Sequence, residues 1–230
     1  MRVTIHQPEF APWLVFFHKV SLTNRLILLN DVQFRKNYLH NRNQIRTSQG
    51  VAWITVPVEH RGLSTPINQV PIAWKAQPDW QEHLLRAVRS AYQRASYFDE
   101  LFPGFSKIVD EAGQSLDSLN IPLLKWMLES FGLHPEIRLS SEWHVSETRS
   151  GRILQLCLES AATTYLSGVS GREYLDLAAF QRAGIQVEFQ EFHHPIYPQL
   201  HAPFHPRISA LEALFLFGPR ARRLLEAAWP

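Results

Sequence analysis

The sequence predicts an α/β protein with a mostly parallel sheet and a helical section inserted between an N-terminal and a C-terminal α/β part. Short apolar runs at 3–5 and 25–30 lie on either side of an amphipathic run at 13–20. Strand, helix and strand within about thirty residues form a βαβ unit, whose two strands are nearly always parallel. We expect one domain over 1–230, with a helical subdomain at about 79–132.

The middle of the chain changes from the hydrophobic period of strands to that of helices. Residues 51–56 alternate and are rich in β-branched side chains, which predicts a strand that ends at Pro57. Residues 67–72 are a second candidate strand. From there on, apolar residues recur at helical spacing. We expect three helices, at 79–92, at 98–109 with an interruption at Pro103 and Gly104, and at 120–131.

The final third of the chain returns to alternating helices and strands, which predicts a second parallel unit. Glycine at 184 is a typical helix stop, and a Ser/Gly turn at 167–171 separates a strand from a helix. The expected elements are helices at 151–161 and 172–183 and strands at 163–167 and 186–192.

Composition excludes several classes of protein. Apolar residues make up 45% of the chain and charged residues 19%, as in ordinary globular proteins. The 23 basic and 21 acidic side chains give a net charge of +2, which does not indicate a nucleic-acid partner. Cys157 is the single cysteine, and the pattern of its predicted helix indicates an inert core residue. With no signal-peptide pattern and no apolar run of about 20 residues, we expect a cytoplasmic protein without a membrane span.

A polar corner after the first apolar run is the first candidate site. Pro8 and Pro12 prevent regular structure there, and a helix is expected to follow. In open α/β sheets, ligands bind at such a corner, outside the carboxyl end of a strand. We therefore predict two catalytic residues, His6 as general base or phosphate contact and Glu9 as its orienting partner or as proton acceptor. A Pro-rich turn in which both side chains only cap the helix explains the pattern equally well.

The segment after the second apolar run is denser in hydrogen-bonding side chains than a connecting loop requires. Arginine offers a planar fork to carboxylate or phosphate, and lysine offers a point charge. This composition predicts an anionic ligand, although a solvated polar loop is the alternative. The candidate substrate-binding residues are Asp31, Gln33, Lys36, Asn41, Arg42, Asn43 and Arg46.

Two later segments are further candidates. The turn at 167–171 could offer backbone donors to an anion through Ser167, Gly168, Ser170 and Gly171, although a plain strand-to-helix turn uses the same residues. The Pro-rich and His-rich loop at 193–206 is expected to cover the site, with Tyr197 and Gln199 facing inward. Its histidine spacing matches no zinc pattern, so we predict no metal site. The sequence does not indicate which cofactor, if any, is used.

A set of short motifs extends over nearly the whole chain. The motifs are His6-Gln7-Pro8, Pro12-Trp13, Phe16-Phe17, Lys19, Asp31-Val-Gln33-Phe34, Asn41-Arg42-Asn43, Trp53, Val56-Pro57-Val58, Tyr165 to Gly171, Tyr174-Leu175, Tyr197-Pro-Gln199, Ser209, Leu214-Phe215 and Gly218. Together they resemble the motifs of the WbqC-like protein family. The resemblance adds Gln7, Lys19 and Tyr174 to the candidate substrate-binding residues. It implies a bacterial protein of cell-surface polysaccharide (O-antigen) biosynthesis, and the layout is similar to the Rossmann-like fold of nucleotidyltransferases.

Three functions are compatible with these observations. The first is a transferase that moves an acyl- or aminoacyl-type group and acts on an anionic substrate, either a small molecule linked to a nucleotide or a carrier-linked one. The second is a nucleotidyltransferase that uses a nucleoside triphosphate. The third is a non-catalytic scaffold of a biosynthetic complex, with Trp74, Trp80 and Trp143 as partner contacts. For the first, His6 is expected within ligand reach of Arg42 and the Ser/Gly turn.

Overall fold

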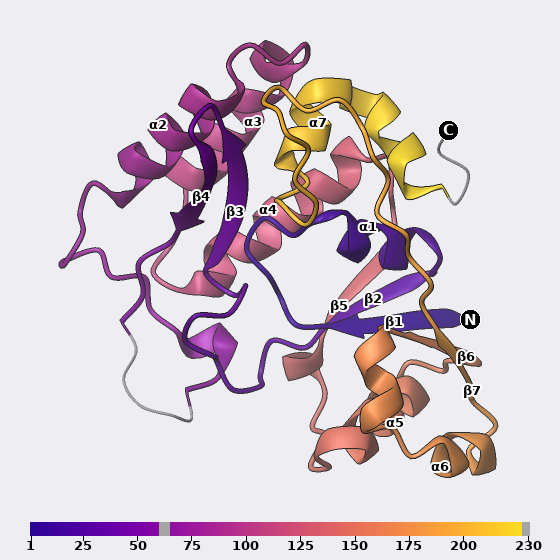
Figure 1. The fold of residues 1–230 in the computed structure, drawn as a ribbon. Coiled ribbons are helices and arrows are strands. Elements are labelled where there is room, and N and C mark those ends of the chain that lie inside the picture. The colour runs from indigo at the N-terminus through magenta and orange to yellow at the C-terminus, as the bar shows by residue number, and fades with distance from the viewer. Residues whose placement is uncertain (60–64, 227–230) are drawn as a thin grey trace.

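A parallel sheet of five strands, in the order β5-β2-β1-β6-β7, lies at the centre of the computed structural model, which describes residues 1–59 and 65–226 (Figure 1). This confirms the predicted α/β class and the mostly parallel sheet. The elements are β1 (Arg2–His6), α1 (Leu14–Ser21), β2 (Arg25–Leu28), β3 (Arg42–Thr47), β4 (Gly50–Thr55), η1 (Ile67–Gln69), α2 (Trp80–Tyr92), α3 (Phe98–Asp110), α4 (Leu116–Ser130), β5 (Glu136–Leu139), η2 (Ser140–Glu142), α5 (Arg149–Glu159), β6 (Thr164–Ser167), η3 (Val169–Glu173), α6 (Leu177–Arg182), β7 (Gln186–Phe189), α7 (Leu211–Phe217) and η4 (Gly218–Leu225).

The order of the strands places β1 in the middle of the sheet. The chain moves outward from β1 to β2 and β5, and it then returns to the other side of β1 with β6 and β7. The direction of winding therefore reverses between β1 and β6, and in open α/β sheets ligands bind outside the carboxyl ends of the strands at such a point.

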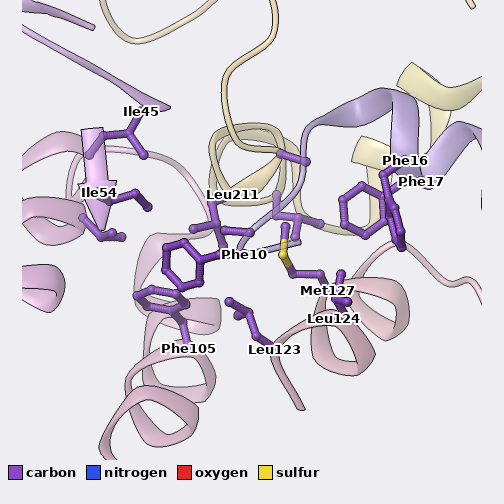
Figure 2. Packing of buried hydrophobic residues seen from close by; sticks show 14 of the residues in the cluster. Phe10, Phe16, Phe17, Ile45, Ile54, Phe105, Leu123, Leu124, Met127 and Leu211 are labelled. Atoms are coloured by element: carbon purple, nitrogen blue, oxygen red, sulfur yellow. The ribbon is translucent and has the colours of Figure 1, made fainter. Parts of the chain in front are cut away.

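Residues that alternate along the central strands belong to two separate hydrophobic cores, one on each face of the sheet. Leu26 and Leu28 of β2 belong to a large core with α1, α2, α3, α4 and α7, whereas Val3 and Ile5 of β1 pack with α5 and α6 on the opposite face (Figure 1). Figure 2 shows the large core, where Phe10, from the corner after β1, lies beside residues of α3 and α7. The corner that follows β1 is thus anchored in the main core of the protein.

Some predicted elements differ from the structure. Residues 42–47 are not a loop but β3, which forms an antiparallel hairpin with β4 outside the main sheet. Residues 67–72 contain the turn η1 instead of a strand. The strand β5 was not predicted, because its sequence Glu-Ile-Arg-Leu holds only two apolar residues.

The predicted interruption of the helix at 98–109 is wrong, because α3 continues through Pro103 and Gly104. A Cβ at Gly104 would lie 2.7 Å from Trp126 Nε1. Glycine therefore permits the close packing of α4 against α3. The predicted helix at 172–183 is instead divided into η3 and the short helix α6, which begins after the cap Asp176.

Asn43 connects the corner after β1 to the hairpin of β3 and β4 through hydrogen bonds. Its buried Nδ2 donates to the carbonyls of Ala11 at 2.8 Å and Phe10 at 3.3 Å, and Ala11 has a φ of 45°, which is in the left-handed region. Asn43 thus has a role in the fold, and its contact with a ligand stays a prediction.

We expect Asn43→Ala to lower the free energy of unfolding by about 1–3 kcal/mol, because it leaves two carbonyls without a buried donor. Urea denaturation measures this loss. The matched control is Gln93→Ala, which removes an exposed amide and should change the free energy by less than about 0.5 kcal/mol. Equal midpoints for Asn43→Ala and the control would contradict the anchoring role.

Candidate functional site

A cavity of about 590 Å³ lies at the carboxyl ends of β1 and β6, where the winding of the sheet reverses. The end of β1, the loop after β2, the start of α5 and the turn after β6 all contribute to its lining. The lining residues are Ile5, His6, Gln7, Glu9, Lys19, Leu29, Val32, Arg35, Tyr38, Arg149, Arg152, Ile153, Tyr165, Ser167, Gly168, Ser170 and Tyr174.

The structure brings together some of the predicted site residues and places others elsewhere. The first corner and the Ser/Gly turn meet at the cavity, whereas Arg42 is not part of its lining. The predicted residues that line the cavity are His6, Gln7, Glu9, Lys19, Ser167, Gly168, Ser170 and Tyr174. Those outside the lining are Asp31, Gln33, Lys36, Asn41, Arg42, Asn43, Arg46, Gly171, Tyr197 and Gln199.

Asp31 supports the wall of the cavity instead of lining it. Its Oδ2 accepts from Arg152 Nη2 at 2.5 Å, and its Oδ1 accepts from Ser140 Oγ at 2.5 Å. Arg152 Nη1 also donates to the carbonyl of Val145 at 3.0 Å. These contacts fix the Arg152 guanidinium at the cavity wall, so Asp31 supports a residue of the lining.

Asn41 and Arg42, at the start of β3, both form hydrogen bonds to the backbone. Asn41 Nδ2 donates to the carbonyl of Val56 at 2.8 Å. Arg42 Nη2 donates to the carbonyl of Asn37 at 2.7 Å, and its guanidinium lies over the ring of Trp53. Neither residue lies in the lining of the cavity, and their contact with a ligand stays a prediction.

Tyr197 and Gln199 belong to a second, buried polar network around Glu212. Tyr197 Oη and Gln199 Nε2 donate to Glu212 Oε2 at 3.2 Å and 2.8 Å. Burial raises the pKa of Glu212 to about 7. Arg46 donates to the carbonyl of Ala202 in the same loop. The loop is thus tied to α7 and to β3. Tyr197, Gln199 and Arg46 lie outside the lining of the cavity, and their contact with a ligand stays a prediction.

Three more predicted residues lie outside the lining. Gly171 is buried in η3, and a Cβ there would collide with Ser167 Oγ, so this glycine permits the tight turn. Lys36 is exposed in the loop after β2. Gln33 is exposed, and its backbone forms an isolated bridge with Pro66.

His6 has one ring nitrogen engaged by the backbone. Nδ1 lies 2.9 Å from the carbonyl oxygen of Gln7, which can only accept, so Nδ1 carries the proton. Nε2 then carries a lone pair, and no hydrogen bond to it is found among the described residues. Burial and the charge of Lys19 lower the pKa of His6 to about 3. This side chain suits hydrogen-bond acceptance better than general-base catalysis at neutral pH.

Glu9 and Lys19 are the buried charged groups of the cavity, with 5% and 4% of their surface exposed. Burial raises the pKa of Glu9 to about 7, and the charge of Lys19 opposes this shift. Burial likewise lowers the pKa of Lys19 to about 8, while Glu9 opposes it. No hydrogen bond to the Glu9 carboxyl is found in the described parts of the chain. Glu9 therefore fits a proton acceptor that works near neutral pH.

Arg35, Arg149 and Arg152 bring three guanidinium groups to the lining of the cavity, of which that of Arg152 is paired with Asp31, and none of the three was predicted from the sequence. Arg149 and Arg152 belong to the first turn of α5, which was expected to begin at 151. The missing information was β5, because without it the start of α5 could not be placed beside β1. The pattern that could have revealed Arg149 and Arg152 from the sequence is a pair of arginines at the start of a helix in a βαβ unit.

Across residues 1–59 and 65–226, no cluster of three or more His, Cys, Asp or Glu side chains suits a metal ion.

Comparisons with known proteins agree with the pattern of motifs. The family model of the WbqC-like protein family matches residues 7–224. A protein of Mycobacterium tuberculosis described as uncharacterized is 32% identical over 223 residues, which cover 96% of this chain and 95% of that protein. No solved structure matches the chain. Within the described residues, no helix combines the length and apolar character needed to cross a membrane. The chain belongs to the WbqC-like protein family.

Proposed function

We propose that this protein is a bacterial transferase that moves an acyl- or aminoacyl-type group to an amino or hydroxyl acceptor, with an anionic nucleotide-linked or carrier-linked substrate. Its place would be the assembly of cell-surface polysaccharide, such as O-antigen, or of a related metabolite. The observation that supports this most is a single cavity that combines cationic side chains, Arg35, Arg149 and Arg152, with a buried carboxyl group, Glu9.

The arrangement supports a division of labour. The arginines would hold phosphate or carboxylate oxygens of the substrate through charge-assisted hydrogen bonds. Glu9 would take a proton from the amino or hydroxyl group of the acceptor. At the same time, the nitrogen or oxygen of that group would form a bond to the carbonyl carbon of the transferred group. The bond from that carbon to the carrier would then break, and the leaving group would depart with the electron pair and accept a proton from Lys19.

The architecture is consistent with this proposal. The sheet order and the cavity at the reversal of winding fit a Rossmann-like layout, and α2, α3 and α4 would form a helical subdomain within one domain. Folds of this layout host many chemistries, so the function rests on the cavity and not on the fold.

Arg152→Gln should weaken the binding of inorganic pyrophosphate at least about tenfold, because one charge-assisted hydrogen bond contributes roughly 1.5–3 kcal/mol. Isothermal titration calorimetry measures the Kd. The matched control is Arg94→Gln, which removes an exposed arginine of the segment after α2 and should leave the Kd unchanged. Equal affinities of Arg152→Gln and wild type would contradict the anion-binding role of the cavity.

A nucleotidyltransferase is the second candidate, and the position of His6 favours it. A neutral imidazole at the end of the first strand, beside arginines, could accept a hydrogen bond from a protonated phosphate or a ribose hydroxyl. Calorimetric titration with each nucleoside triphosphate and magnesium separates the two candidates, since absence of heat for every base would remove this one. The third function, a non-catalytic scaffold, was predicted to use Trp80 as a partner contact. Trp80 cannot serve as a surface contact, because it is only 2% exposed.

A further inference from the structure

We infer that the carboxamide of Gln7 is a neutral hydrogen-bond donor of the cavity for a phosphoryl or carbonyl oxygen, and that buried His40 is the positioning residue that aims it. This inference rests on the proposed anion-binding function of the same cavity. His40 does not line the cavity, and it would act only through Gln7.

The hydrogen bonds of His40 determine its tautomer. The backbone N–H of Arg35 donates to His40 Nδ1 at 3.2 Å, so Nδ1 must carry the lone pair. In the neutral ring the proton is then on Nε2, which lies 2.8 Å from Gln7 Oε1 and donates to it. Burial and the charge of Arg35 lower the pKa of His40 to about 4, which is consistent with the neutral ring.

The tautomer in turn determines the orientation of the Gln7 amide. With the Nε2–H of His40 as donor, the oxygen of the carboxamide must face His40, and its NH₂ group is left for other partners. No hydrogen bond to Gln7 Nε2 is found among the described residues, and this atom is not fully enclosed. Because Gln7 lines the cavity, two amide hydrogens are available to a ligand there.

The surroundings fix this chain of contacts to the fold. His40 is 0% exposed, and its ring contacts those of Phe34 and Tyr38. Its carbonyl accepts from the buried Nδ2 of Asn120 at 2.7 Å, which ties the loop to α4. A ligand oxygen would therefore meet a donor whose orientation is set before binding, which reduces the entropy lost on binding.

The first experiment reads the tautomer without any ligand. Long-range ¹H–¹⁵N correlation spectra of the wild-type protein should show His40 with a protonated Nε2 and an unprotonated Nδ1 at neutral pH. A proton on Nδ1 would reverse the amide of Gln7 and overturn the inference. His40→Gln identifies the signals of His40 by their disappearance.

The second experiment measures the Kd of inorganic pyrophosphate by calorimetry. Gln7→Leu and His40→Leu should each weaken binding about tenfold, because each removes the aimed amide. The double variant should be no weaker than Gln7→Leu alone, since His40 acts through Gln7. His40→Gln should restore most of the affinity, because a glutamine can accept from Arg35 N–H and donate to Gln7 Oε1.

The outcomes separate this inference from the proposed function. Wild type that binds no pyrophosphate contradicts the proposed anion site, and with it the ligand assigned to Gln7. Wild type that binds, with Gln7→Leu equal to it, overturns the inference and leaves the proposed function standing. Additive losses in the double variant, or a His40→Gln variant as weak as His40→Leu, would mean that His40 serves only the fold.

Discussion

Glu9→Gln should lower the rate of group transfer by about 10²–10⁴-fold, the usual contribution of a general base. The variant keeps the size of the side chain and removes its ability to accept a proton. Glu129→Gln on α4 is the matched control, because it makes the same change at an exposed position outside the lining of the cavity. Single-turnover kinetics at substrate saturation measure the rate. A Glu9→Gln rate within about threefold of the control would contradict the role of Glu9.

The pH dependence of the transfer rate is an independent test of the role of Glu9. Glu9 must be ionised to accept a proton, which requires a pH above about 7, and Lys19 must be protonated to donate one, which requires a pH below about 8. The rate of wild type should therefore follow a narrow bell with its maximum between these values. The acid limb should disappear in Glu9→Gln, and a flat profile of wild type across this range would argue against the pair.

Ionisation of Glu9 should have opposite effects on the transfer rate and on stability. It is expected to raise the rate but to lower the free energy of unfolding. Its pKa is raised from 4.5 to about 7 in the folded protein, so between these values the folded state binds more protons than the unfolded chain. The contribution of Glu9 to stability thus falls as the pH rises through this window. At pH 8 Glu9→Gln should melt at a higher temperature than wild type, and at pH 4 this difference should vanish.

Phe10→Ala should lower the free energy of unfolding by about 3–5 kcal/mol. Phe10 is fully buried and points from the corner after β1 into the main core, beside Leu211 and Phe105 (Figure 2). The substitution removes the packing of a whole ring and also frees the chain next to Glu9. Urea denaturation gives the loss of stability, and calorimetry with pyrophosphate gives the effect on the cavity.

Phe105→Ala separates the two effects of Phe10→Ala. Phe105 is equally buried in the same core but belongs to α3, outside the lining of the cavity. Its loss of stability should be similar, with the Kd for pyrophosphate close to that of wild type. Phe10→Ala should weaken pyrophosphate binding in addition, because the corner loses its anchor. Equal Kd values in both variants would show that the site does not depend on this anchor.

The sequence was sufficient for those parts of the site that adjoin strands with strong local patterns. The corner that starts at His6 and the Ser/Gly turn after β6 both follow short apolar strands, so their meeting at one edge of the sheet could be predicted. Arg149 and Arg152 could not, because β5 has a weak pattern and its pairing with β2 spans more than a hundred residues. Long-range pairing of this kind leaves no local signal.

Polar side chains were the least predictable part. Arg46 and Gln199 have the chemistry of ligand contacts, yet they hold a loop and a buried carboxylate. Residue type alone does not distinguish a donor that serves a ligand from one that serves the backbone, because both satisfy the same hydrogen bonds. Only the tertiary arrangement made that distinction here.

The central position of β1 has a consequence for the synthesis of the protein. One edge of β1 pairs with β2, about twenty residues later, but its other edge pairs with β6, where Arg2 is opposite Thr164. A chain that emerges from the ribosome must therefore carry an open strand edge until β6 has been made. Because the reversal of winding that creates the cavity lies between β1 and β6, the cavity can form only after that point.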